Sequence, residues 1–145
     1  RVQPLQDLGI SSIRESLDLS FPAAHRAILD EVNSNWIKTI EFNEEMLSLV
    51  GEWIRTRKVA LLSNMGFHHL NFLRKSIPDV FANTIQHISC EVGARKPTKL
   101  FYQSFIWENP EFGSAWYLDD LQENVEAGDR AGLNGNIFHI DWLMK

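Results

Sequence analysis

The strongest constraint on the fold is the alternation of short apolar runs with helical patterns. Apolar runs at 59–62 and 115–118 each stop at polar pairs, Ser63-Asn64 and Asp119-Asp120. A short apolar run that follows a helix predicts a strand buried on both faces. Weaker strand patterns lie at 84–88 and 136–140. Because strands alternate with helices over short connections, we predict an α/β fold: a Rossmann-like, mostly parallel sheet with flanking helices.

Helical patterns fill the segments between these strands. The clearest begins after Asn43, a predicted N-cap, and repeats apolar residues at steps of three and four up to Ile54. Further helices are predicted at 64–75, from Pro97 to Phe105, and from Asp120 to Ala131 with Gly132 as the C-terminal cap. Residues 1–43 are helical in pattern and contain no strand pattern, so we treat them as a segment separate from 44–145.

Composition excludes several classes of protein. The chain has 145 residues, enough for one domain, and its charge of −5 argues against binding to nucleic acid. The single cysteine, Cys90, excludes an internal disulfide and a cysteine-based zinc site, and fits a reducing, cytoplasmic compartment. No apolar run approaches the roughly 20 residues that cross a bilayer, so no membrane partner is expected. The first residue is Arg1 rather than Met, which indicates a piece of a longer protein.

Polar residues at the strand ends indicate phosphate chemistry. In an open α/β sheet ligands bind at the carboxyl ends of the strands, where Ser63-Asn64 and Asp119-Asp120 are predicted to lie. Paired acids can hold Mg²⁺, Lys96 can place a charge beside phosphate, and a serine hydroxyl can hold phosphate oxygens. Taken alone, Ser63-Asn64 and Asp119-Asp120 can each be explained as a helix cap, and Lys96 as part of a solvated pair of charges. Their order along the chain favours phosphoryl transfer.

These motifs resemble those of the haloacid dehalogenase superfamily of Mg²⁺-dependent phosphohydrolases, over about residues 45–141. Leu61-Leu62-Ser63-Asn64 is similar to the second family motif, and Gly93-Ala94-Arg95-Lys96-Pro97 to the third. Tyr117-Leu118-Asp119-Asp120, followed by Asn124 and Gly128, is similar to the fourth. The residues of the second and third motifs resemble those of the glucose-1-phosphatase-like branch of the superfamily. Residues 1–43 would then be part of a helical cap, and 44–145 the α/β core.

The resemblance implies hydrolysis of a small phosphorylated metabolite with Mg²⁺. By this resemblance, Ser63 and Asn64 bind the phosphoryl group and Lys96 neutralises its charge, with Ser63 and Lys96 taking part in catalysis. Asp119 and Asp120 hold Mg²⁺. His68 or His69 contacts the substrate. Metal binding by the two histidines themselves is disfavoured, because adjacent residues point to different faces of a helix.

One family motif is missing. The first motif is a strand ending in Asp-x-Asp, which carries the nucleophile, and none of Asp7, Asp18 and Asp30 combines a strand with that spacing. This strand lies centrally in the family fold, and each buried backbone group that it leaves unpaired costs about 1–3 kcal/mol. We therefore expect an upstream segment or a second chain to supply it, or the sheet to rearrange. Placement of Leu61 and Tyr117 in unrelated sheets would contradict the resemblance.

Two other functions stay open. The chain can be a non-catalytic binding or interaction module of the same fold, or one subunit of a split enzyme, and in isolation we expect it to be inactive. A phospho-accepting receiver domain fits less well, because its acid pair follows the first strand, whereas Asp119-Asp120 follows the run at 115–118 near the C-terminus. A dinucleotide-binding domain requires G-x-G-x-x-G, which the chain lacks. Cys90 and Trp36 are expected to have packing roles.

Overall fold

A computed structural model describes residues 6–12, 15, 28, 31–32 and 35–139. The predicted helices before residue 35 and the strand end at Ile140 fall largely or wholly outside these residues and remain predictions. The predicted boundary between 1–43 and 44–145 also stays a prediction. The chain divides into two compact units, Arg1–Gly93 and Ala94–Lys145, which we describe one at a time. Among the described helices, none has the length and apolar character needed to cross a membrane.

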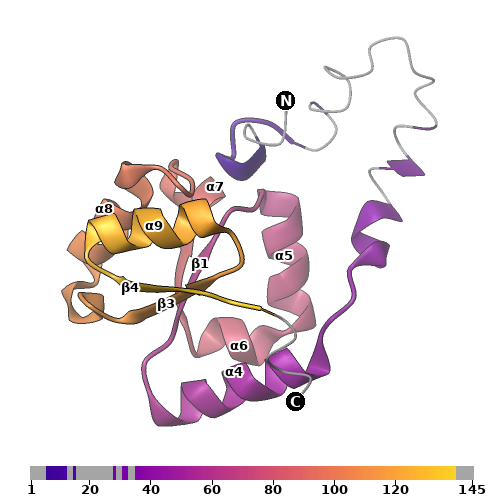
Figure 1. The fold of residues 1–145 in the computed structure, drawn as a ribbon. Helices are drawn as coiled ribbons and strands as arrows, with labels where there is room; N and C mark the ends of the chain where they lie inside the picture. Colours follow the sequence, from indigo (N-terminus) through magenta and orange to yellow (C-terminus); the bar gives the residue numbers. More distant parts are fainter. Residues whose placement is uncertain (1–5, 13–14, 16–27, 29–30, 33–34, 140–145) are drawn as a thin grey trace. The chain divides into compact units, whose positions relative to one another are not determined.

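The first unit contains one pair of parallel strands. Strand β1 (Ala60–Ser63) pairs with β2 (Ile85–Ile88), so that Ala60 lies opposite Ile85 and Ser63 opposite Ile88. Helices α5 (Phe67–Ser76) and α6 (Pro78–Ala82) carry the chain from β1 back to the start of β2 (Figure 1). The strands predicted at 59–62 and 84–88 are therefore confirmed within one residue at each end.

The remaining helices complete the first unit. Helix η1 (Trp36–Thr39) precedes α4 (Glu44–Thr56), whose start is fixed by Asn43: its side chain accepts a hydrogen bond of 2.8 Å from the Met46 amide. Helix α7 (Ser89–Val92) follows β2 and ends at Gly93, which has a φ of 69°. The core cluster of this unit consists of Met65, Leu70, Phe81, Ile88 and Cys90. Cys90 is thus a buried packing residue, as expected.

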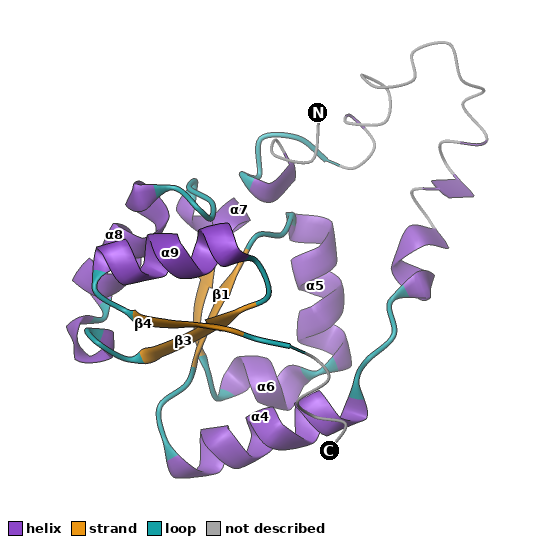
Figure 2. Cartoon of the chain, in the orientation of Figure 1, coloured by secondary structure: helices purple, strands orange, loops and turns teal. Residues whose placement is uncertain are grey.

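The second unit contains the other strand pair. After α8 (Lys99–Glu108) and η2 (Pro110–Phe112), strand β3 (Trp116–Asp119) leads through α9 (Gln122–Ala131) to β4 (Asn134–Ile137). Strands β3 and β4 are parallel, with Trp116 opposite Asn134 and Asp119 opposite Ile137 (Figure 2). Phe101, Tyr102 and Phe105 of α8 are completely or almost completely buried.

Glycines allow α9 to end and to pack against β3. Gly132 has a φ of 103° and ends the helix, as predicted. Gly128 faces Tyr117 so closely that a Cβ atom there would lie 2.6 Å from the Tyr117 Cδ1 atom. This contact explains why a glycine is required four residues after Asn124.

Some sequence predictions are wrong in their details. The last strand occupies 134–137 rather than beginning at Asn136, because pairing with β3 decides its register. The helix predicted at 64–75 occupies 67–76, and the short helices α6 and α7 were not predicted. Pro97 lies two residues before α8 instead of in its first turn.

All described strands pair in parallel, which confirms the predicted α/β class, but they form two sheets of two strands each. Among the described residues, Leu61 in β1 and Tyr117 in β3 therefore belong to different sheets. No described strand pairs with both β1 and β3, the position that the missing first strand would take.

Candidate functional site

The carboxyl end of β3 holds a buried ionic network centred on Asp119. This residue is 6% exposed, and its Oδ1 atom accepts hydrogen bonds from the Leu121 amide at 3.0 Å and from Asn124 Nδ2 at 2.8 Å. Its Oδ2 atom accepts hydrogen bonds from Lys96 Nζ at 2.5 Å and from the Tyr117 hydroxyl at 2.7 Å. Each carboxylate oxygen therefore has two donors, the usual capacity of an ionised carboxylate.

The network keeps Asp119 ionised. Burial on its own raises the pKa of this carboxyl, but hydrogen bonds from Lys96, Tyr117 and Asn124 outweigh burial and hold the pKa below its usual value. The side chains of the Lys96–Asp119 ion pair are only 11% and 4% exposed, so solvent screens their attraction weakly. Lys96 and Asp119, predicted separately from the third and fourth motifs, are thus in direct contact.

Two tyrosines, which the sequence analysis did not assign to the site, extend the network. The Tyr117 hydroxyl lies 3.3 Å from the Tyr102 hydroxyl, and Tyr102 donates a hydrogen bond of 3.0 Å to the Asn124 carbonyl oxygen. Burial, followed by hydrogen bonds to Tyr102 and Asp119, raises the pKa of Tyr117. A signal for Tyr117 exists in the sequence: residues two apart in a strand face the same side of the sheet, which places its side chain beside Asp119.

The described residues do not form a magnesium site. Mg²⁺ requires oxygen ligands with free lone pairs, and those of Asp119 are already occupied by four donors. Asp120, predicted as a second ligand, is exposed, and nothing in the structure joins it to the Asp119 network. Across the part of the chain that the structure describes, no group of three or more His, Cys, Asp or Glu side chains is placed to hold a metal ion.

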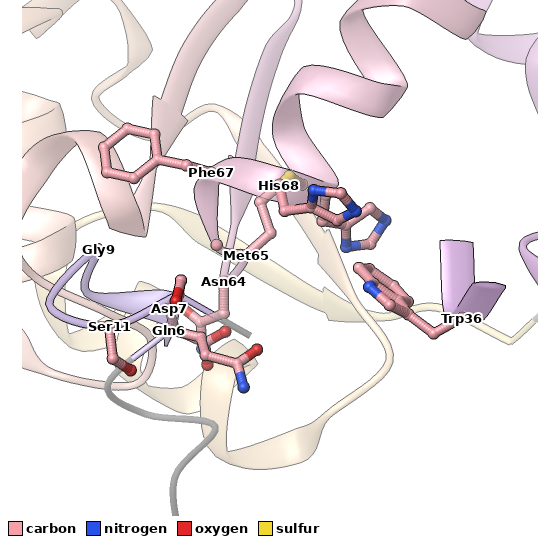
Figure 3. A pocket seen from close by; sticks show the side chains of 12 residues that line it. Gln6, Asp7, Gly9, Ser11, Trp36, Asn64, Met65, Phe67 and His68 are labelled. Atoms are coloured by element: carbon pink, nitrogen blue, oxygen red, sulfur yellow. The ribbon is translucent and has the colours of Figure 1, made fainter. Parts of the chain in front are cut away.

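In the first unit, a cavity of about 570 Å³ lies beside the carboxyl end of β1. Asn64 and His68, both predicted to bind substrate, line it together, whereas Ser63 ends β1 just before it. The buried Asp7 and the half-buried Trp36 also line the cavity, and Figure 3 shows Asp7 and Asn64 on one side of the view and Trp36 on the other. Asp7, rejected as a nucleophile from its sequence context, thus belongs to a cavity wall.

Trp36 contacts both adjacent histidines. Its ring centroid lies 5.7 Å from that of His68 and 5.5 Å from that of His69, in the second case edge to face. Trp36 lies outside the buried core, and its ring packs against the two histidines of the cavity. Burial lowers the pKa of His69, the neighbouring His68 lowers it further, and Asp7 opposes the change.

This lowered pKa predicts a pH-dependent stability. The unfolded chain takes up a proton at His69 more readily than the folded chain does. The free energy of unfolding is therefore fully maintained above the ordinary histidine pKa of 6.5 and falls as the pH drops below that value. His69→Gln should flatten the dependence of the urea midpoint on pH between about 7 and 5. Equally steep profiles for the variant and the unaltered chain would contradict this origin.

The fold has well-matched counterparts among solved structures. A HAD family enzyme from Bacteroides thetaiotaomicron, BT-2542, matches with a TM-score of 0.76 and 15% identity, over 97% of this chain and 76% of that one. The same enzyme in complex with magnesium and inorganic phosphate matches with a TM-score of 0.73 and 16% identity, over 92% and 71%. Its aspartate-to-alanine variant in the same complex gives 0.74 and 16%, over 92% and 72%. No protein-family model and no curated protein matches the chain.

These matches cover more than nine-tenths of the chain and so include both strand pairs. The division of the strands into two sheets therefore does not contradict the resemblance. Parallel strands and flanking helices agree with the fold of those enzymes. The chain has the fold of the haloacid dehalogenase (HAD) enzymes.

Proposed function

We propose that this chain is part of a HAD-type phosphohydrolase that acts on a small phosphorylated metabolite. The attacking aspartate would come from outside the described residues, on an upstream segment or a second chain. The observation that carries the proposal is the buried Lys96–Asp119 pair at the carboxyl end of β3, in a fold whose solved counterpart binds magnesium and inorganic phosphate. A lysine held in this way presents a fixed positive charge to a phosphoryl group.

The resemblance gives each predicted residue its own role in the reaction. In the second unit Lys96 would neutralise charge on the phosphoryl oxygens, and Asp119 would fix the position of its ammonium group. In the first unit the Ser63 hydroxyl and Asn64, where β1 ends, would hold phosphoryl oxygens. The cavity that Asn64 and His68 line would receive the organic part of the ester.

The first test is a native mass spectrum of the purified protein together with a phosphatase assay. A species heavier than 16.7 kDa, carrying an Asp-x-Asp strand, should hydrolyse p-nitrophenyl phosphate. In that species Lys96→Met should reduce turnover by about 10²–10³-fold, the usual effect of removing one group that stabilises the transition state. Lys99→Met, at an exposed lysine three residues away, is the matched control and should retain full turnover.

Two results would overturn the proposal. The first is protein purified from its natural source that is a species of 16.7 kDa alone and has no phosphatase activity, which would favour a non-catalytic binding module of the same fold. The second is equal turnover of the Lys96→Met and Lys99→Met proteins, which would remove Lys96 from the reaction.

A further inference from the structure

Strand β4 contains the only asparagine–glycine pair in the chain, Asn134-Gly135. Asn134 is exposed, so water reaches its side chain. In an unfolded chain such a pair is chemically unstable, because glycine has no side chain to keep its amide nitrogen away from the side-chain carbonyl carbon of the asparagine before it. The pair is therefore a candidate for covalent modification.

The fold explains why glycine occupies position 135. Helix α9 passes so close to β4 that a Cβ atom on Gly135 would lie 2.8 Å from both the Asp129 Oδ1 atom and the Val125 carbonyl oxygen. Contacts that short would push the helix away from the strand, so packing requires glycine here. The reactive pair is thus a consequence of how α9 packs on β4.

Two restraints keep the Gly135 amide nitrogen away from the Asn134 side chain. The first is strand pairing: the Asn134 amide donates a hydrogen bond of 2.9 Å to the Ala115 carbonyl oxygen, which holds the backbone extended. The second is Asp129. Successive amides of a strand point to opposite edges, so the Gly135 amide points away from β3, and the Asp129 Oδ1 atom accepts its hydrogen bond at 2.6 Å. The nitrogen can reach the Asn134 side chain only after β4 opens locally and releases both restraints.

We propose that Asn134 is a deamidation site, and that strand pairing and Asp129 suppress its reaction until β4 opens. The Gly135 amide nitrogen attacks the Asn134 side-chain carbonyl carbon and forms a C–N bond. The proton of that amide passes through water to the departing NH₂ group, which leaves as ammonia, and a cyclic imide remains. Water then opens the ring at either carbonyl carbon and leaves aspartate or isoaspartate at this position. Water is the only co-reactant, and nothing is oxidised or reduced.

The isoaspartate product would alter the strand beside Asp119. Isoaspartate adds a carbon atom to the main chain, so the residues after it lose their register with β3. In the intact chain Ile137 lies opposite Asp119, and the Phe138 amide donates a hydrogen bond of 2.9 Å to the Asp119 carbonyl oxygen. Deamidation is therefore an irreversible record of opening in the unit that contains Asp119. The inference does not depend on the hydrolysis proposed above.

The test compares the 145-residue chain in buffer and in guanidinium chloride, both incubated at mildly alkaline pH. Mass spectrometry of the tryptic peptide 131–145 detects the exchange of an NH₂ group for a hydroxyl group, and an isoaspartate methyltransferase identifies the product. The unfolded chain should react at Asn134 as fast as a synthetic peptide of the same residues, and the folded chain about tenfold more slowly or less. Asn136, in the same peptide but followed by the branched Ile137, is the internal control and should keep its amide.

Asp129→Ala tests the second restraint. The substitution removes the carboxylate that holds the Gly135 amide, so deamidation of the folded chain should become about tenfold faster, the factor that corresponds to losing one hydrogen bond to a charged group. Glu126→Ala, at an exposed acid on the same helix, is the matched control and should react like the unaltered chain.

Three results would contradict the proposal. An unfolded chain that keeps its Asn134 amide would show that the site does not exist. Equal rates for the folded and unfolded chains would show that the fold gives no protection. Equal rates for folded Asp129→Ala and Glu126→Ala proteins would show that Asp129 is not a restraint. If circular dichroism shows that Asp129→Ala does not fold, the comparison of the unaltered chain in its folded and unfolded states decides alone.

Discussion

Replacing Asp119 with asparagine should lower the free energy of unfolding by about 3–5 kcal/mol, the usual cost of removing one partner from a buried ion pair. The substitution leaves the buried Lys96 ammonium without its counter-charge and exchanges an acceptor for an amide that faces the Tyr117 hydroxyl. Urea denaturation followed by far-ultraviolet circular dichroism measures the change.

Asp120→Asn is the matched control for this prediction. Asp120 is exposed, so its replacement should change the free energy of unfolding by no more than about 0.5 kcal/mol. The lowered pKa of Asp119 adds a pH dependence: its stabilising contribution is complete above the ordinary carboxyl pKa of 3.8 and disappears as the pH falls through the lower pKa of the folded state. Equal losses of stability in the two variants would show that the Lys96–Asp119 pair contributes nothing.

Phe101→Ala should destabilise the chain by a similar amount, about 3–5 kcal/mol, because it leaves a cavity in the core of the second unit. The Phe101 side chain is 0% exposed and lies edge to face against Tyr102, with ring centroids 5.5 Å apart. The adjacent Leu100 is 65% exposed, so Leu100→Ala should have little effect. A larger loss for Leu100→Ala than for Phe101→Ala would mean that the opposite face of α8 is buried.

Local sequence signals predicted most of the helices and strands, because short-range interactions determine where these elements begin and end. Asn43 caps α4 with its own side chain, and Gly132 ends α9 with a positive φ. The apolar runs identified β1 and β3 to within one residue. The predicted start of β4 was two residues too late because Asn134 and Gly135 carry no strand signal of their own. Their place in the strand depends on pairing with β3. The short helices α6 and α7 were missed for a related reason: few residues give little periodicity.

The candidate site was predicted by residue type more successfully than by arrangement. The family motifs selected Lys96 and Asp119 as candidates, but they assigned the two residues to different ligands. Their direct contact depends on how the segment before α8 passes the end of β3, and short-range patterns do not encode this. The motif does not distinguish Asp119 from Asp120, but in the structure Asp119 is buried and Asp120 is exposed.

The chain contains two tyrosines, Tyr102 and Tyr117, and both lie in the second unit with their hydroxyl groups buried. Burial raises the pKa of Tyr102 to about 12 and the pKa of Tyr117 further. In the unfolded chain both phenols would ionise near the ordinary value of 10.0. An alkaline titration monitored by tyrosinate absorbance therefore records the unfolding of the second unit alone. The protein thus carries its own optical probe for the unit that contains Lys96 and Asp119.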